Sequence, residues 1–204
     1  MRYSSSVKFA VLSSSHGTTF QAILEAVDSG SLTAECIGLI TDRADRGCID
    51  KAKVAHLPFI IVEKKVGESR EAYDQRLDAA IRSLGEIDVV AAIGWMFVLT
   101  APFIAKWRNK ILNVHPALLP KYGGAGMYGE RVHRAVLDAG DKESGMTIHL
   151  MDEGVDSGKI LLQKTCPVLP GDTVETLKSR VQALEREWYP RVLQMIEEKK
   201  LRNY

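Results

Sequence analysis

The sequence predicts an α/β protein with a Rossmann-like, mostly parallel twisted sheet and helices on both faces. Short and almost wholly apolar runs, such as residues 87–93, alternate along the chain with longer stretches of mixed polarity. In those longer stretches apolar residues recur at helical spacing, as Phe20, Ile23 and Val27 do. Strands that are apolar throughout belong to sheets covered on both faces, and their alternation with helices is typical of parallel βαβ units.

The strands are predicted where apolar runs are bounded by turn residues. They lie at residues 7–13, 35–40, 59–62, 87–93, 111–114, 147–151 and 159–165. The helices are predicted where apolar residues stand three and four apart. They lie at residues 18–27, 46–56, 70–84, 131–139 and 173–199. Ser69 is the expected N-cap of the third helix, and Pro190 is expected to bend the last one.

Two stretches show neither periodicity. Residues 121–129 hold four glycines in nine positions, so we expect a long irregular loop there. Residues 152–158 form an acidic loop between two expected strands. Because no linker, repeat or low-complexity tract interrupts the chain, we expect one domain over residues 1–204, with halves at about 7–110 and 111–204.

The composition is that of an ordinary globular protein. The chain has 204 residues, of which 46% are hydrophobic and 26% charged, enough to bury a core without metals or disulfides. Its 27 Lys and Arg residues balance its 26 Asp and Glu residues, which argues against a nucleic-acid or membrane-surface partner. Cys36, Cys48 and Cys166 lack metal-ligand spacing, so we expect free thiols, no bound metal and a cytoplasmic location.

The segment Ile-Leu-Asn-Val-His-Pro-Ala-Leu-Leu-Pro at residues 111–120 is the most informative about function. It begins as a buried strand and ends in a loop bounded by proline. Asn113 and His115 are two apart and therefore point to the same side of the strand. An amide N–H can hold a developing oxyanion and an imidazole can move a proton, so the pair suits acyl or formyl transfer. The competing interpretation is local turn chemistry.

The first strand runs into a turn of small residues, Ser13 to Thr19, followed by a helix. A helix N-terminus offers free N–H groups and a favourable dipole to an anion, and Gly17 lets the backbone approach closely. Since neither a GxGxxG fingerprint nor a P-loop lysine is present, a single phosphate is expected rather than a dinucleotide. The alternative is an ordinary turn with Ser/Thr capping, in which His16 is simply exposed.

The acidic loop and the last helix hold further candidates. Asp156 lies between glycines and follows a strand that contains His149, so its carboxylate could favour a charged imidazole. The alternative is a solvated hairpin turn. Gln182 and Glu185 share one face of the last helix, which by default is solvated. His133 is interpreted as a helix-surface residue, and His149 as a hydrogen-bonded strand residue.

Four ordered motifs resemble the folate-dependent formyltransferases over residues 7–193. They are NVHPALLPKY at 113–122, DEGVDSG at 152–158, RVQALEREWYP at 180–190 and SREAYD at 69–74. The resemblance is greatest to the branch that formylates glycinamide ribonucleotide in purine synthesis, and it implies that family's fold. It implies an enzyme that transfers a formyl group from 10-formyltetrahydrofolate, as cosubstrate, to the amino group of that ribonucleotide.

The resemblance also implies roles for individual residues. Asn113 would hold the formyl oxygen, His115 would act as the acid, and Asp156 would keep the imidazole charged. The substrate-binding positions are Gly17, Thr18, Thr19, Gln182 and Glu185. The folate-binding positions are Arg70 near the tail, Met96, Phe97, Val98 and Leu99 on one wall, Asn113, and Asp152, Glu153, Gly154, Val155 and Asp156 on the other.

The chain departs from the family at a few of these positions, and other functions remain open. Phe97 and Thr19 stand where arginine and asparagine are common, and residues 123–129 lengthen the connection after the His-Pro motif. The alternatives are a sister formyltransferase acting on an aminosugar nucleotide, a formyltetrahydrofolate hydrolase, or a non-catalytic binder on the same fold. We expect a monomer or a homodimer with small-molecule substrates.

Overall fold

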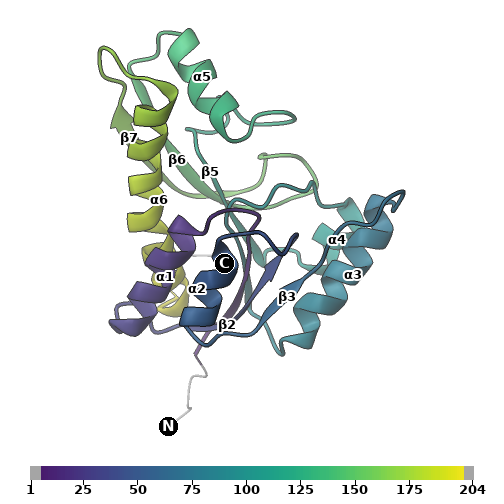
Figure 1. Cartoon of the computed structure of the whole chain (residues 1–204). Helices are drawn as coiled ribbons and strands as arrows, with labels where there is room; N and C mark the ends of the chain where they lie inside the picture. The colour runs from purple at the N-terminus through teal and green to yellow at the C-terminus, as the bar shows by residue number, and fades with distance from the viewer. Residues whose placement is uncertain (1–5, 200–204) are drawn as a thin grey trace.

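Seven strands form a single sheet in the order β3-β2-β1-β4-β5-β6-β7 in the computed structural model, which describes residues 6–199 (Figure 1). The first five strands pair in parallel, and β6 and β7 join the sheet antiparallel. The strands are β1 (Lys8–Leu12), β2 (Glu35–Thr41), β3 (Phe59–Ile61), β4 (Val89–Ala92), β5 (Ile111–His115), β6 (Glu143–Leu150) and β7 (Ile160–Pro167). The predicted mostly parallel sheet is confirmed, although β6 begins four residues earlier than its apolar run suggests.

The helices are α1 (Thr18–Asp28), α2 (Cys48–Val54), α3 (Arg70–Ser83), α4 (Ala101–Lys106), α5 (Glu130–Asp138) and α6 (Val174–Glu197). The Ser69 hydroxyl accepts a hydrogen bond from the Ala72 N–H at 3.1 Å, so the predicted N-cap is confirmed. The α4 helix was not predicted, because six residues are too few to show helical periodicity. Pro190 is buried within α6, which continues through it. Among residues 6–199, no helix is long and apolar enough to cross a membrane.

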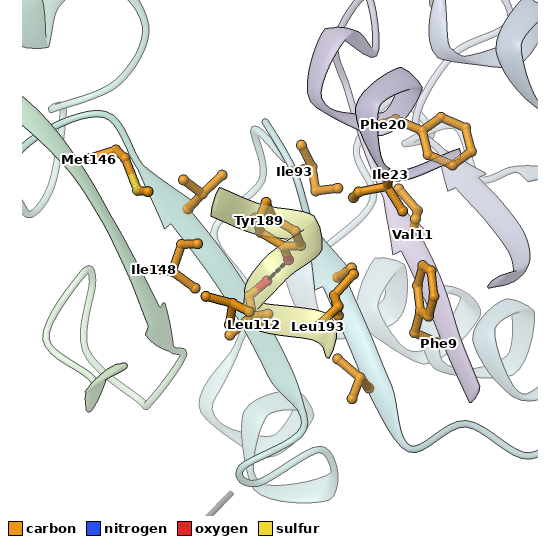
Figure 2. Packing of buried hydrophobic residues seen from close by; sticks show 14 of the residues in the cluster. Phe9, Val11, Phe20, Ile23, Ile93, Leu112, Met146, Ile148, Tyr189 and Leu193 are labelled. Carbon is orange, nitrogen blue, oxygen red and sulfur yellow. Dashed lines mark hydrogen bonds between the residues drawn. The ribbon is translucent and has the colours of Figure 1, made fainter. Parts of the chain in front are cut away.

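Two apolar clusters cover the two faces of the sheet. The larger lies between the sheet and α1, α2 and α6, and the smaller lies between the sheet and α3 and α4 (Figure 1). Within the larger cluster the Tyr189 hydroxyl of α6 donates a hydrogen bond to the Leu112 carbonyl oxygen of β5 at 2.7 Å (Figure 2). This bond fixes the long helix against the strand that holds the Asn-x-His motif.

Side-chain alternation along β5 and β6 leaves polar groups on the α3–α4 face. Leu112 and Val114 of β5 point into the larger cluster, as do Met146, Ile148 and Leu150 of β6. The opposite face of these strands therefore presents Asn113, His115, Thr147 and His149. Of β5, the smaller cluster includes Ile111 but neither Asn113 nor His115, so these polar side chains lie beyond its edge.

Candidate active site

Asn113 and His149 face each other across the antiparallel pair β5–β6. The Asn113 Nδ2 atom lies 3.1 Å from the His149 Nε2 atom, and the His149 Nδ1 atom lies 3.0 Å from the Leu150 carbonyl oxygen. Since a carbonyl only accepts, Nδ1 carries the proton and Nε2 accepts from the amide of Asn113. Burial lowers the pKa of His149, which favours this neutral form. One amide N–H of Asn113 is therefore fixed, and the other is available to a ligand.

His115 is buried, and both of its ring nitrogens face acceptors. The Nε2 atom lies 2.7 Å from the main-chain oxygen of Tyr122, and the Nδ1 atom lies 3.4 Å from Oδ2 of Asp156. The carbonyl requires a proton on Nε2 in every charge state. Nδ1 is therefore the nitrogen that can gain or lose a proton, and it faces the carboxylate.

Asp156 reaches the cluster from the acidic loop at residues 152–158, in a left-handed conformation with φ of 58°. Its Oδ2 accepts a hydrogen bond from the Gly124 N–H at 3.0 Å, and its Oδ1 lies 3.7 Å from Nε2 of His149. Asp152 organises the same loop by accepting from the Gly154 N–H and the Ser157 hydroxyl. The structure thus brings Asn113, His115 and Asp156 together with His149, and the solvated-hairpin interpretation is wrong for Asp156.

Of the two histidines interpreted by default, His149 agrees with its interpretation and His133 does not. His149 is hydrogen-bonded, as expected, but its place beside Asn113 depends on a cross-strand register that the sequence does not reveal. His133 was interpreted as a surface residue, and this is wrong: it is only 2% exposed on the buried side of α5 with Val132 and Val136. Burial lowers the pKa of His133 to about 4. The apolar spacing of its neighbours could have indicated this position.

The turn from Ser13 to Thr19 is built around Gly17, the N-cap of α1. Gly17 has φ of 78°, and an added Cβ would lie 2.9 Å from the Cα of Cys48 in α2. The Ser15 hydroxyl accepts from the Gly17 N–H at 3.0 Å, but no side chain caps α1. The Ser/Thr-capping alternative is therefore wrong for this helix, and its first-turn N–H groups remain open to an anion. His16 is exposed, as expected.

Glu185 of α6 contacts the beginning of α1. The buried Thr19 hydroxyl lies 3.3 Å from Oε2 of Glu185. Glu185 is half-buried against this hydroxyl, so the solvated-face interpretation is wrong for this residue, and burial raises the pKa of its carboxyl to about 7. Gln182 is half-buried one turn earlier on α6, while Thr18 is exposed at the start of α1. The turn from Ser13 to Thr19 therefore lies next to the face of α6 that holds Gln182 and Glu185.

A cavity of about 210 Å³ lies beside the segment that follows β4. Its lining residues are Lys64, Arg70, Tyr73, Met96, Phe97 and Val98. Phe97 packs against Tyr73, with ring centroids 5.1 Å apart. Met96 and Val98 expose about half of their surface, as does Val155 in the acidic loop at residues 152–158. Leu99 differs from the expectation, because it is buried in the smaller apolar cluster and does not line this cavity.

Comparison with known proteins decides the family. Residues 7–193 match the formyl transferase family. The chain belongs to the formyl transferase family. It is 35% identical to phosphoribosylglycinamide formyltransferase of Haemophilus influenzae, with 96% of this chain and 89% of that protein covered. It superposes on a crystal structure of glycinamide ribonucleotide transformylase 1 from Symbiobacterium toebii with a TM-score of 0.88 and 35% identity, covering 95% of this chain and 89% of that one.

The formyl transferase family also includes much longer relatives. The chain is 37% identical over 189 residues to the trifunctional purine biosynthetic protein adenosine-3 of Bos taurus. The match covers 93% of this chain but only 18% of that protein. Family membership and the formyltransferase fold, both expected from the four motifs, are confirmed. Two of the four motifs supply Asn113, His115 and Asp156, which lie together where β5 ends.

Proposed function

We propose that this protein transfers a formyl group from 10-formyltetrahydrofolate to the amino group of glycinamide ribonucleotide in purine biosynthesis. The observation that most supports this proposal is the convergence of Asn113, His115 and Asp156 where β5 ends. In mostly parallel sheets ligands bind at the carboxyl ends of the strands. The names and high coverage of the formyltransferase relatives support the same substrates.

The chemistry follows from which atoms remain free. The substrate amine attacks the formyl carbon, and the carbonyl oxygen becomes an oxyanion held by the second amide N–H of Asn113. The C–N bond to the folate nitrogen then breaks as that nitrogen takes a proton from Nδ1 of His115. The proton lost by the attacking amine returns to the pair formed by His115 and Asp156. The amine is itself the nucleophile, so the reaction needs no serine or cysteine nucleophile.

We assign the two substrates to two different regions near the catalytic cluster. The N–H groups around Gly17, Thr18 and Thr19 bind the ribonucleotide phosphate, and Gln182 and Glu185 bind its ribose side. For the folate, exposed apolar groups at Met96, Val98 and Val155 suit a flat ring. Arg70 suits the carboxylate tail, with Phe97 in the same cavity. Glu153 and Gly154 complete the second wall together with Asp152.

The sister reactions stay testable alternatives. Formyl transfer is measured with glycinamide ribonucleotide, an aminosugar nucleotide and water as competing acceptors of the same 10-formyltetrahydrofolate. Turnover with glycinamide ribonucleotide alone is the predicted result. Turnover only with the sugar, or only hydrolysis, would contradict the assigned acceptor but keep the catalytic cluster. We further propose a cytoplasmic enzyme that acts as a monomer or a homodimer.

A further inference from the structure

We propose that Lys121, Tyr122 and Asp141 are positioning residues that hold the main chain of residues 122–124 against both members of the catalytic pair. This inference rests on the proposed function of His115 and Asp156. The side chains of these three residues bond to one another and not to His115 or Asp156, and none of them lines the cavity beside β4. They act on the reaction only through the backbone between them and the pair.

The main chain of residues 122–124 contacts both members of the pair. The Tyr122 carbonyl oxygen lies 2.7 Å from Nε2 of His115, and the Gly124 N–H donates to Oδ2 of Asp156 at 3.0 Å. Gly123, between them, is packed so closely that an added Cβ would lie 2.5 Å from the Leu119 side chain and 3.3 Å from the Asp156 Cβ. A movement of this short segment would therefore change the geometry at both ends of the pair.

The segment has an unfavourable conformation that needs external support. Tyr122 has φ of 58°, which a bulky side chain rarely adopts, and Gly124 has φ of 92°. Residues held in such regions persist where the surrounding structure determines them, and they cluster at functional sites. These two residues make the main-chain contacts to the pair: Tyr122 to His115 and Gly124 to Asp156.

Asp141, in the turn between α5 and β6, provides the support. Its carboxylate accepts from the Lys121 ammonium at 2.6 and 2.8 Å and from the Tyr122 hydroxyl at 2.8 Å. These hydrogen bonds hold the pKa of Asp141 below its usual value. The Asp141 N–H bonds to the Val136 carbonyl oxygen at 3.3 Å, which ties the acceptor to α5. Two consecutive side chains are thus fixed just before the backbone turns toward His115.

The consequence for the reaction is the choice of ring nitrogen. While the Tyr122 carbonyl holds the proton on Nε2, Nδ1 of His115 is left to exchange protons beside Asp156. If the segment moves away, neutral His115 can place its proton on Nδ1 and present the wrong nitrogen. The groups that face this imidazole are Asp156 from the loop, His149 from β6 and His133 from α5. Substrate binding should change little, because those contacts come from other segments.

The test compares Asp141→Asn, Tyr122→Phe and Lys121→Met with the wild type. We expect kcat for formyl transfer to fall about tenfold or more, with KM for both substrates within about twofold. In the ligand-free protein, nitrogen NMR of His115 should show loss of the uniform Nε2–H tautomer. Lys121→Arg, which keeps a cationic donor, should restore most of kcat.

Asp50→Asn is the matched control, because Asp50 forms an exposed ion pair with Lys53 on α2. It should leave kcat and the His115 tautomer unchanged. An unchanged tautomer in folded Asp141→Asn and Tyr122→Phe proteins would overturn the proposal, as would a rise in KM at constant kcat. If the wild type transfers no formyl group to glycinamide ribonucleotide, the proposed function fails, whereas the tautomer measurement still decides the positioning role.

Discussion

Replacing Glu185 by glutamine should make the stability of the protein less sensitive to pH. Glu185 lies half-buried between α6 and α1, and burial raises its pKa from 4.5 to about 7, while the Thr19 hydroxyl opposes this rise. Below about pH 4.5 both the folded and unfolded states are protonated at this position. Between about pH 4.5 and 7 the folded state binds more protons than the unfolded state, so stability falls as the pH rises.

The structure gives the size of this effect. A pKa that rises from 4.5 to about 7 on folding destabilises the protein by at most about 3 kcal/mol above pH 7, since a tenfold change in proton affinity corresponds to about 1.4 kcal/mol. Glu185→Gln cannot ionise. The free energy of unfolding of the variant, relative to that of the wild type, should therefore increase by about 3 kcal/mol from pH 4 to pH 8.

Denaturant unfolding of both proteins at a series of pH values provides the measurement. The amide oxygen of glutamine still accepts from the Thr19 hydroxyl, so any change in that bond is independent of pH, and other titrating groups cancel between the two proteins. Thr19→Val is the matched variant: it removes a donor that favours the charged carboxylate, so the decline in stability should extend to higher pH. Parallel stability curves for wild type and Glu185→Gln would show that this carboxylate is well solvated, and would refute the reasoning.

Three further changes test separate parts of the structure. Gly17→Ala should lower the free energy of unfolding by about 1 kcal/mol or more and weaken ribonucleotide binding, because φ is 78° and its Cβ would meet Cys48; denaturant unfolding and calorimetric titration would check both. Tyr189→Phe should destabilise the protein by about 1–2 kcal/mol, because the buried Leu112 carbonyl loses its donor, while KM stays constant. Asp156→Asn should lower kcat for formyl transfer by about tenfold or more at constant KM, because the carboxylate beside Nδ1 of His115 loses its charge; steady-state kinetics would check this, and an unchanged kcat would argue against coupling to His115.

Local sequence patterns predicted most of the fold, because the strands and longer helices bury continuous apolar surfaces. The run at residues 87–93 could only be a buried element, and Ser69 before a periodic stretch marks a helix start. The α4 helix and the first half of β6 were missed since Thr100 to Lys106 is short and Glu143 to Gly145 is not apolar. There, pairing and packing with distant segments decide the conformation.

In the candidate site, too, some residues could be predicted from local sequence and others could not. Asn113 and His115 share a face because of strand geometry alone, which the sequence reveals. His149 and the Tyr122 carbonyl join them through cross-strand register and loop conformation, which no local pattern encodes. Resemblance to a family supplied the link between Asp156 and His115, and the structure brings their side chains within 3.4 Å.

The central claim is that His115 is the acid of a formyl transfer, and one variant tests it most directly. For His115→Ala, kcat with saturating 10-formyltetrahydrofolate and glycinamide ribonucleotide is compared with the dissociation constant for the folate. The account predicts that kcat falls by about 10²-fold or more while folate binding changes by less than about threefold. Wild-type turnover in His115→Ala, or a loss of activity explained wholly by lost folate binding, would contradict it.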